Sequence, residues 1–328
     1  MSPLASRLLT QLRQGSEPLT VDQLASLSDL NSEDRRAYLA VWSEVPGERR
    51  LAILEALGRL ADDRFELNFD ALDIFALDDP DPRVRSVAIR NLWENEDPSL
   101  ADRFLQILNA DPEPEPVHAA ARALGHFVLL GELGRLGDSQ LDRIVAGLLA
   151  VFTESPDETA RRLCVESLGY SSHPEATRVI ESAFVADDED WRAAALLAMG
   201  RSANADWGPS ILPMLRHPSP ALRREAAAAC GELELNASRT ELIELLEDSH
   251  PDVRRAAIWS LGQIGGKSAY LALQQIVEHT TDPEEAELAD RALENLAFVD
   301  GSGQLLLYAM DDGMDDDLAD EVDEAGEE

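Results

Sequence analysis

One short phrase recurs seven times along the chain, most clearly as DVRRAAIWSLG at 252–262. The copies align on the residue before the usual arginine, at Val84, Pro116, Ala160, Trp191, Leu222, Val253 and Leu288, with steps of 32, 44, 31, 31, 31 and 35 residues. Three equal consecutive steps indicate one structural unit copied in tandem, and a unit this short cannot bury its own apolar face. The sequence therefore predicts a stack of repeats, which offers a long surface for holding a partner.

Each copy has the pattern of one amphipathic helix. Positions 0, 4, 5 and 8 from the aligned residue are apolar, which makes a single stripe at 3.6 residues per turn. Position 4 is always small, so neighbouring helices can approach closely; its residues are Ala88, Ala120, Cys164, Ala195, Ala226, Ala257 and Ala292. A glycine follows the stripe in five copies, where it suits a helix end; these are Gly125, Gly169, Gly200, Gly231 and Gly262.

Second apolar helices are expected between these copies, for example at 101–108, 176–184 and 240–248. Proline-bearing turns precede the repeat helices, because proline ends one helix and fixes φ at the start of the next. No strand pattern of any length is present. The predicted fold is all-α, a right-handed α-solenoid of about seven to eight helix pairs, in which 48–58 is a degenerate first repeat.

Three regions are predicted along the chain. Residues 1–47 form an N-terminal helical cap, in which Thr20 and Gln23 have the spacing of a capping box. Residues 48–303 form the repeat solenoid, and the 44-residue step contains a glycine-rich stretch at 131–140 that is expected to be an inserted loop. Residues 304–328 hold a short apolar segment and an acidic tail, expected to be disordered, because the last 18 residues carry 11 acidic groups and no basic one.

Net charge and hydropathy indicate which kinds of partner and which location are expected for the chain. The chain has 64 acidic and 28 basic residues, a net charge of −36, so binding to nucleic acid or to an anionic membrane is disfavoured. A basic protein partner would be attracted over long range; alternatively, the acidity serves solubility alone. There is no apolar stretch long enough to span a membrane and no pattern of a signal peptide, so a cytoplasmic protein is expected. Cys164 and Cys230 are expected to be small core residues.

The repeats resemble the short HEAT-like repeats of phycobilisome-lyase-related proteins. The resemblance is carried by the phrase D-x-x-V-R-x-x-A-x-x-x-L-G, here Asp81 to Leu92 and again at 252–262, and by the period of 31; it covers about residues 48–297. It implies a HEAT-like solenoid in which the repeat helix lines the concave, inner side. Such repeats occur in chromophore lyases, in an iron-dependent hydroxylase and in many adaptors.

The resemblance also implies a ladder that joins an aspartate in each turn to an arginine six residues later. The sequence matches it at Asp79/Arg85 and Asp248/Arg254. Six residues before Arg161 and Arg223, the aspartate is replaced by Ser155 and His217. The ladder is therefore expected to be incomplete. The arginines in this column are expected to be structural; they are Arg85, Arg161, Arg192, Arg223 and Arg254.

The sequence gives no sign of catalytic chemistry. In the hydroxylase branch of the family, iron is held by His-Glu dipeptides, and none of the six histidines here is followed by glutamate. No phosphate-binding loop, nucleophile elbow or Cys-His pairing occurs. The chain is therefore predicted to be no enzyme and to hold no metal and no cofactor. A subunit of a chromophore-lyase-like enzyme is the alternative.

Arginine and tryptophan, which are typical binding anchors, recur in the exposed columns of the repeat helices. The predicted contact set is Arg90, Trp93, Arg122, Arg162, Arg224, Arg255 and Trp259. Alternatively, these arginines solvate the helix face and the tryptophans pack between repeats. The predicted function is a monomeric, non-catalytic scaffold that holds a protein or peptide along the concave surface; a structural assembly factor in a larger complex is a further alternative.

Overall fold

The computed structural model describes residues 12, 18–28 and 30–299, which fall into two compact units, one up to residue 198 and one from residue 199. The described residues are helical with no strand, as predicted. The predicted tail, 304–328, lies outside the described residues. The domain boundaries predicted at residues 47 and 303 stay predictions.

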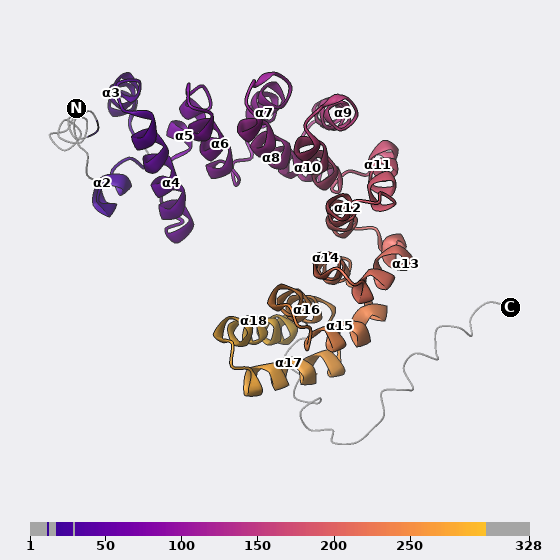
Figure 1. Ribbon diagram of the computed structural model, residues 1–328. Coiled ribbons are helices and arrows are strands. Elements are labelled where there is room, and N and C mark those ends of the chain that lie inside the picture. The colour runs from indigo at the N-terminus through magenta and orange to yellow at the C-terminus, as the bar shows by residue number, and fades with distance from the viewer. Residues whose placement is uncertain (1–11, 13–17, 29, 300–328) are drawn as a thin grey trace. The chain divides into compact units, whose positions relative to one another are not determined.

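Unit 1 consists of helices in pairs. They are α2 (Val21–Ala25), α3 (Ser32–Trp42), α4 (Gly47–Asp63), α5 (Asp70–Ala76), α6 (Pro82–Asn91), α7 (Pro98–Ala110), α8 (Pro114–Glu132), α9 (Asp138–Glu154), α10 (Glu158–Leu168), α11 (Pro174–Phe184) and α12 (Glu189–Arg201), the last of which runs into unit 2. The repeat helices α4, α6, α8 and α10 pack against one another in sequence, and α7, α9 and α11 form a second row beside them (Figure 1).

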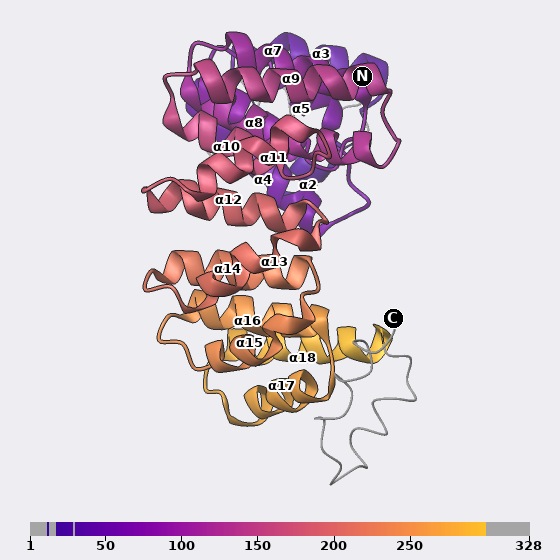
Figure 2. The same ribbon diagram turned by 90° about the vertical axis from the view of Figure 1, so that its right-hand side faces the viewer.

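Unit 2 continues the same alternation. It contains η1 (Ala205–Trp207), α13 (Gly208–Ile211), η2 (Leu212–Arg216), α14 (Pro220–Glu232), η3 (Asn236–Ser238), α15 (Arg239–Leu245), α16 (Pro251–Ile264), α17 (Lys267–His279) and α18 (Pro283–Val299). Figure 2 shows α13 and α14, then α15 and α16, in successive layers of this unit. Pro213 has no N–H to donate, which explains why the helical stretch 208–216 divides into α13 and the 3₁₀ segment η2. With α3–α4 as the first pair, eight pairs are found in the described part of the chain.

Side-chain caps and prolines set the helix starts that the sequence predicted. The Asp81 carboxylate accepts from the backbone N–H of Arg83 at 3.0 Å at the start of α6, and Pro82 follows it at the first helical position. The capping box at Thr20 is also confirmed: its N–H donates to Gln23 Oε1 at 2.8 Å, and its hydroxyl accepts from the Gln23 N–H.

The apolar stripe is buried as predicted. Val84, Ala88 and Ile89 of α6 and its C-cap residue Leu92 are each no more than 1% exposed. The degenerate first repeat is confirmed, since α4 buries Ile53, Leu54 and Leu57 at the corresponding positions. In α18, Ala292 and Leu296 are buried but the aligned Leu288 is only half-buried. Among the described residues, no further repeat helix follows α18 to cover it.

The glycines after the stripe were interpreted as suiting helix ends. Gly169 is the C-cap of α10, and Gly200, Gly231 and Gly262 lie within the last three residues of α12, α14 and α16, whereas Gly125 lies in the middle of α8. Their role is close helix packing: a Cβ added at Gly231 would lie 2.8 Å from the Cα of Ser260 in the next repeat helix. A side chain at these positions would push adjacent repeats apart.

The loop expected near 131–140 is much shorter than expected. Helix α8 continues to Glu132 and α9 begins at Asp138, so only 133–137 connects them. The extra length of the 44-residue step lengthens the helices instead: α8 has 19 residues and α9 has 17, against 11 in each of α10 and α11. Gly134, with φ of +72°, forms the tight turn that makes so short a connection possible.

Candidate functional site

An arginine ladder joins the repeats at their turns. In unit 1, Arg85 holds the carboxylate of Asp111 with Nε–Oδ2 at 2.8 Å and Nη2–Oδ1 at 2.7 Å. Its remaining Nη1 donates to the backbone carbonyl of Asp79 at 2.7 Å. In unit 2, Arg223 binds Asp248 and the carbonyl of His217 in the same way. Each arginine therefore binds the backbone of its own turn and the carboxylate of the next one.

This arrangement corrects the pairing expected within each repeat. Asp79 does not pair with Arg85 through its side chain; it accepts from the buried Arg50 of the preceding repeat, at 2.9 Å, and from Trp42 Nε1 at 2.8 Å. Likewise Arg254 binds Glu285, with Nε–Oε1 at 2.7 Å, and only the backbone of Asp248. The ladder is therefore more complete than expected. Arg223 lacks an aspartate in its own turn, where the sequence has His217, but it binds Asp248 in the turn of the next repeat.

The ladder is replaced by aromatic contacts at Arg161. Its guanidinium carbon lies 5.5 Å from the Phe152 ring centroid and 5.2 Å from that of Trp191, and its Nε donates to the carbonyl of Phe152 at 2.7 Å. A cation over an aromatic face is stabilised by the ring quadrupole. The contact of α10 with the start of α12 therefore uses a cation–π interaction where Arg85, Arg223 and Arg254 use a carboxylate.

The predicted contact residues of unit 1 differ in their exposure and in whether they form ion pairs. Arg90 and Arg122 are exposed, and neither has a carboxylate partner among the described residues; Arg90 reaches only Ser86 Oγ, at 3.4 Å. Arg162 is half-buried and forms an ion pair with Asp190 at 3.1 Å. Trp93 is 60% exposed.

In unit 2 the predicted contact residues are all engaged. Arg224 pairs with the neighbouring Glu225. Arg255 binds Asp252 at 3.2 Å and Glu284 at 2.9 Å. Trp259 is half-buried, and its ring would be 2.6 Å from a Cβ added at Gly231, so it packs on the preceding repeat helix.

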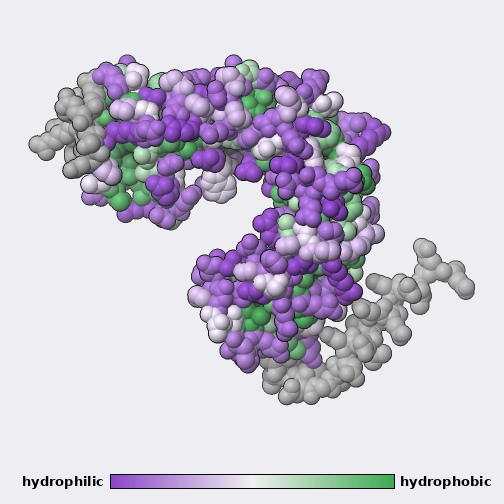
Figure 3. Space-filling model, viewed as in Figure 1, coloured by the Kyte–Doolittle hydropathy of each residue, from purple (hydrophilic) through white to green (hydrophobic). Residues whose placement is uncertain are grey.

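Arg90 and Trp93 come together in a hollow of about 800 Å³ in unit 1, the Phe65–Trp93 groove. It is lined by the second half of α4, the connection 64–69, the start of α5, the end of α6 and residues 93–95, which follow α6. Phe65 is 99% exposed at its rim. Hydrophilic residues cover most of the face seen in Figure 3, so two exposed aromatic side chains around one hollow are unusual for this surface.

Hydrogen bonds fix the floor of the groove. Asn91 Nδ2 donates to the Leu54 carbonyl at 3.0 Å and to Asp73 Oδ1 at 2.9 Å, which ties α6 to α4 and α5. A Cβ on Gly58 would come within 2.4 Å of Asn91 Oδ1, so glycine is required there. Asp73 is 2% exposed, and burial, the largest cause, raises the pKa of its carboxyl well above the usual range, whereas the Asn91 hydrogen bond opposes that shift.

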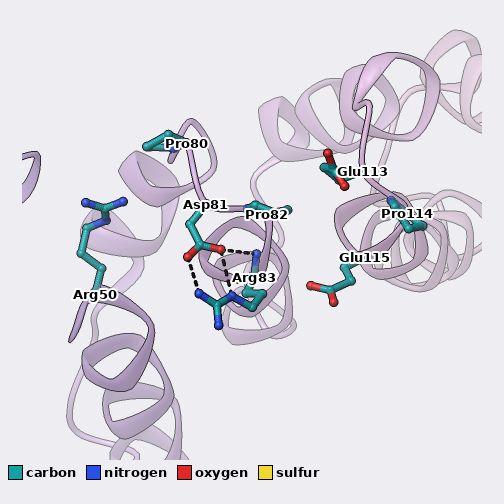
Figure 4. A pocket seen from close by; sticks show the side chains of 8 residues that line it. All are labelled: Arg50, Pro80, Asp81, Pro82, Arg83, Glu113, Pro114 and Glu115. Atoms are coloured by element: carbon teal, nitrogen blue, oxygen red, sulfur yellow. Dashed lines mark hydrogen bonds and ion pairs between the residues drawn. The ribbon is translucent and has the colours of Figure 1, made fainter. Parts of the chain in front are cut away.

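A second cleft, of about 580 Å³, lies between two successive turns of unit 1 (Figure 4). Asp81 and Arg83 line one side and bind each other at 2.8 Å, and Glu113 and Glu115 line the other. Hydrogen bonding to Arg83, the largest cause, lowers the pKa of Asp81. Asp81 is also the N-cap of α6, so the start of a repeat helix is sufficient reason for the polar residues of this cleft.

No cluster of histidine, cysteine or acidic side chains that could hold a metal occurs in the described part of the chain. Both cysteines are buried and free, and burial raises the thiol pKa to about 12 at Cys164 and about 11 at Cys230, so both stay neutral. Within residues 12, 18–28 and 30–299, no helix is both long and apolar enough to cross a membrane.

Sequence reasoning missed Phe65, the most exposed large apolar side chain of the described residues. It lies between α4 and α5, outside the repeat phrase, so no column of the alignment contained it. The available signal was an aromatic residue within a charged, non-helical run, RFELN at 64–68.

Comparison with known proteins supports the fold. Residues 70–140 and 208–297 match the family model described as HEAT repeats. Yeast importin-beta (Kap95p) is similar with a TM-score of 0.51 and 14% identity, over 94% of this chain and 48% of that one. The CpcE–CpcF complex of phycocyanin lyase from Nostoc sp. PCC7120 is similar with a TM-score of 0.47 and 22% identity, over 69% of this chain and 94% of that one. Human deoxyhypusine hydroxylase gives a TM-score of 0.37 and 19% identity, over 90% of this chain and 96% of that one.

A search of curated proteins finds no match. At the identities of the solved structures, a likeness shows the fold alone, and this chain spans about half the length of importin-beta. The fold, the register of buried columns and the family match agree with one another. The chain therefore contains HEAT repeats, at 70–140 and 208–297.

Proposed function

We propose that the chain is a non-catalytic scaffold that binds a protein or a peptide along the face of its repeat helices. The observation that supports this most is that α6 and α8, which pack side by side, present the exposed Arg90 and Arg122 without a carboxylate partner. In a chain with 64 acidic residues, an exposed arginine left unpaired is available to a carboxylate of a partner. In a HEAT solenoid this row of helices is expected to line the concave side.

The contact set now divides into two groups. Arg90, Trp93 and Arg122 are accessible as they stand. Arg162, Arg224, Arg255 and Trp259 take part in intramolecular contacts, so a partner would have to compete with those contacts to reach them. The first group is therefore proposed to carry most of the binding energy.

Affinity capture from a native lysate tests the proposal, with proteins identified by mass spectrometry. The bait is the full chain, compared with its Arg122→Glu variant and with Arg143→Glu as the matched control, because Arg143 is an exposed arginine on α9 of the other row. Arg122→Glu is expected to lose a specific partner that Arg143→Glu retains. Equal capture by all three proteins would contradict the proposal.

A chain ending at Met310 is captured in parallel to test the acidic tail. A partner lost only from this shorter chain would move recognition to the last 18 residues, away from the repeat helices.

A further inference from the structure

We infer that the Phe65–Trp93 groove is the anchoring subsite of this scaffold, and that it takes a peptide segment in which a lysine or arginine stands beside an aromatic or large aliphatic residue. This inference rests on the proposed binding function and names the chemistry of the partner.

The aromatic rim supplies the apolar half of the subsite. Phe65 is 99% exposed and Trp93 is 60% exposed, and both line the same hollow. Aromatic side chains left in water around a concavity are the residues that dominate binding energy when a partner covers them. A hollow of about 800 Å³ has room for one or two side chains of a peptide.

Acidic side chains supply the charged half of the subsite. The exposed carboxylates of Glu55, Asp62 and Glu94 line the groove together with the half-buried Asp70. None of these four forms an ion pair within the described residues, in contrast to the acids of the ladder. Asp70 accepts only from neutral amides, Asn95 at 2.7 Å and Asn68 at 3.1 Å.

Two arginines also line the groove, Arg59 and Arg90, so four accessible carboxylates face two cations. The surplus is negative, and a basic side chain is the complement. A cation over the exposed face of Trp93 would gain a cation–π contact as well. The same carboxylates would repel an acidic peptide or a phosphate backbone.

The groove is formed before any partner binds. Its floor is held by the Asn91 hydrogen bonds to α4 and α5, and Asp70 is fixed by two asparagines. A preformed site loses little conformational freedom on binding, so a short peptide can bind it measurably.

The test selects random peptides displayed on phage against the full-length protein. Peptides that also bind the Phe65→Ala/Trp93→Ala double variant are first removed, and the enriched sequences are synthesised for calorimetry. The expected consensus has a lysine or arginine next to an aromatic or large aliphatic residue. Trp93→Ala is expected to weaken binding of these peptides roughly thirty-fold. Phe75→Ala is the matched control, because Phe75 is an exposed aromatic residue on α5 that does not line the groove, and it should bind with unchanged affinity.

The charge half is tested by Glu94→Gln together with Asp62→Asn, which should weaken binding several-fold and reduce its dependence on salt. No enrichment, an acidic consensus, or equal affinity for Trp93→Ala would overturn the inference. The Arg122→Glu variant separates the two proposals: it should bind the peptides normally even though it loses the captured partner. Unchanged capture by Arg122→Glu, with Trp93-dependent peptide binding, would overturn the repeat-helix face and leave the groove as the binding site.

Discussion

Arg223 on α14 holds Asp248, in the turn before α16, through two nearly parallel contacts, Nε–Oδ2 at 2.7 Å and Nη2–Oδ1 at 3.0 Å. The two side chains are 13% and 8% exposed. Because the pair joins consecutive repeats at a site largely screened from water, it connects their stabilities directly.

Asp248→Ala is expected to lower the free energy of unfolding by about 3 kcal/mol, because it leaves a mostly buried guanidinium without its carboxylate. Glu244→Ala is the control, since Glu244 pairs with Arg216 on the exposed surface of the same unit and should cost less than about 1 kcal/mol. Urea denaturation followed by circular dichroism measures both. Equal losses would show that burial does not strengthen the pair.

The Arg223–Asp248 coupling should weaken in acid. Hydrogen bonding to Arg223, the largest cause, lowers the pKa of Asp248, so its stabilisation is present above the unfolded pKa of aspartate, about 3.9, and is lost as the pH falls toward the lower folded pKa. A double-mutant cycle of Arg223→Ala and Asp248→Ala, repeated across this range, measures the decline. A cycle of Arg161→Met and Phe152→Leu is the comparison, because the Phe152 ring that Arg161 faces has no polar atom with which to bind a carboxylate. A flat Arg223–Asp248 coupling would contradict the assignment.

Gly231→Ala is expected to destabilise the protein by about 1–3 kcal/mol through overpacking, although alanine is the better helix former. The added Cβ would lie 2.6 Å from Trp259 Cζ3 and 2.8 Å from the Cα of Ser260, and backbone cannot move aside cheaply. Gly137→Ala, where a Cβ meets nothing within 4 Å, should cost only the exchange of a glycine N-cap for alanine at the start of α9, about 0.5–1 kcal/mol. Thermal unfolding of both variants measures the two losses of stability. If Gly231→Ala left the stability unchanged, Gly231 would not be required for close packing of the helices.

Asp73→Asn should stabilise the protein increasingly as the pH rises. Burial raises the pKa of Asp73, so the folded state holds its proton more tightly than the unfolded chain. Its contribution is therefore fully present below the unfolded pKa and is lost as the pH rises toward the folded pKa, by up to about 1.4 kcal/mol per pH unit. The difference in urea midpoint between the wild type and Asp73→Asn, measured against pH, should grow over this window. A constant difference would mean that Asp73 does not titrate there.

The sequence predicted the stack because one strong signal, the repeated apolar stripe, sets both the helices and their order. The small column at position 4 and the stripe of α6 are buried as expected. Glycine was harder to interpret, because helix ends and close helix contacts both select it. Only the position of the next helix distinguishes the two, as at Gly231.

The candidate site was less predictable. The ladder was sought within single repeats, whereas the acceptor of Arg223 is 25 residues later. Exposure was expected for all seven contact residues, but ion pairs engage Arg162, Arg224 and Arg255. Phe65 could not be found from a column, since it belongs to a connection between helices. Local period predicts which face of a helix is buried; it does not predict which charges meet across repeats.

The direction of the ladder has a consequence for engineering this chain. Four ladder arginines take their carboxylate from the following turn: Arg50 from Asp79, Arg85 from Asp111, Arg223 from Asp248 and Arg254 from Glu285. A repeat transplanted alone would bring a guanidinium without its acceptor and strip one from its neighbour. A repeat that is exchanged without the turn that follows it would leave its arginine unpaired at one end and a carboxylate unpaired at the other. A repeat that is exchanged together with the following turn would keep its own ion pair, so such segments could be rearranged.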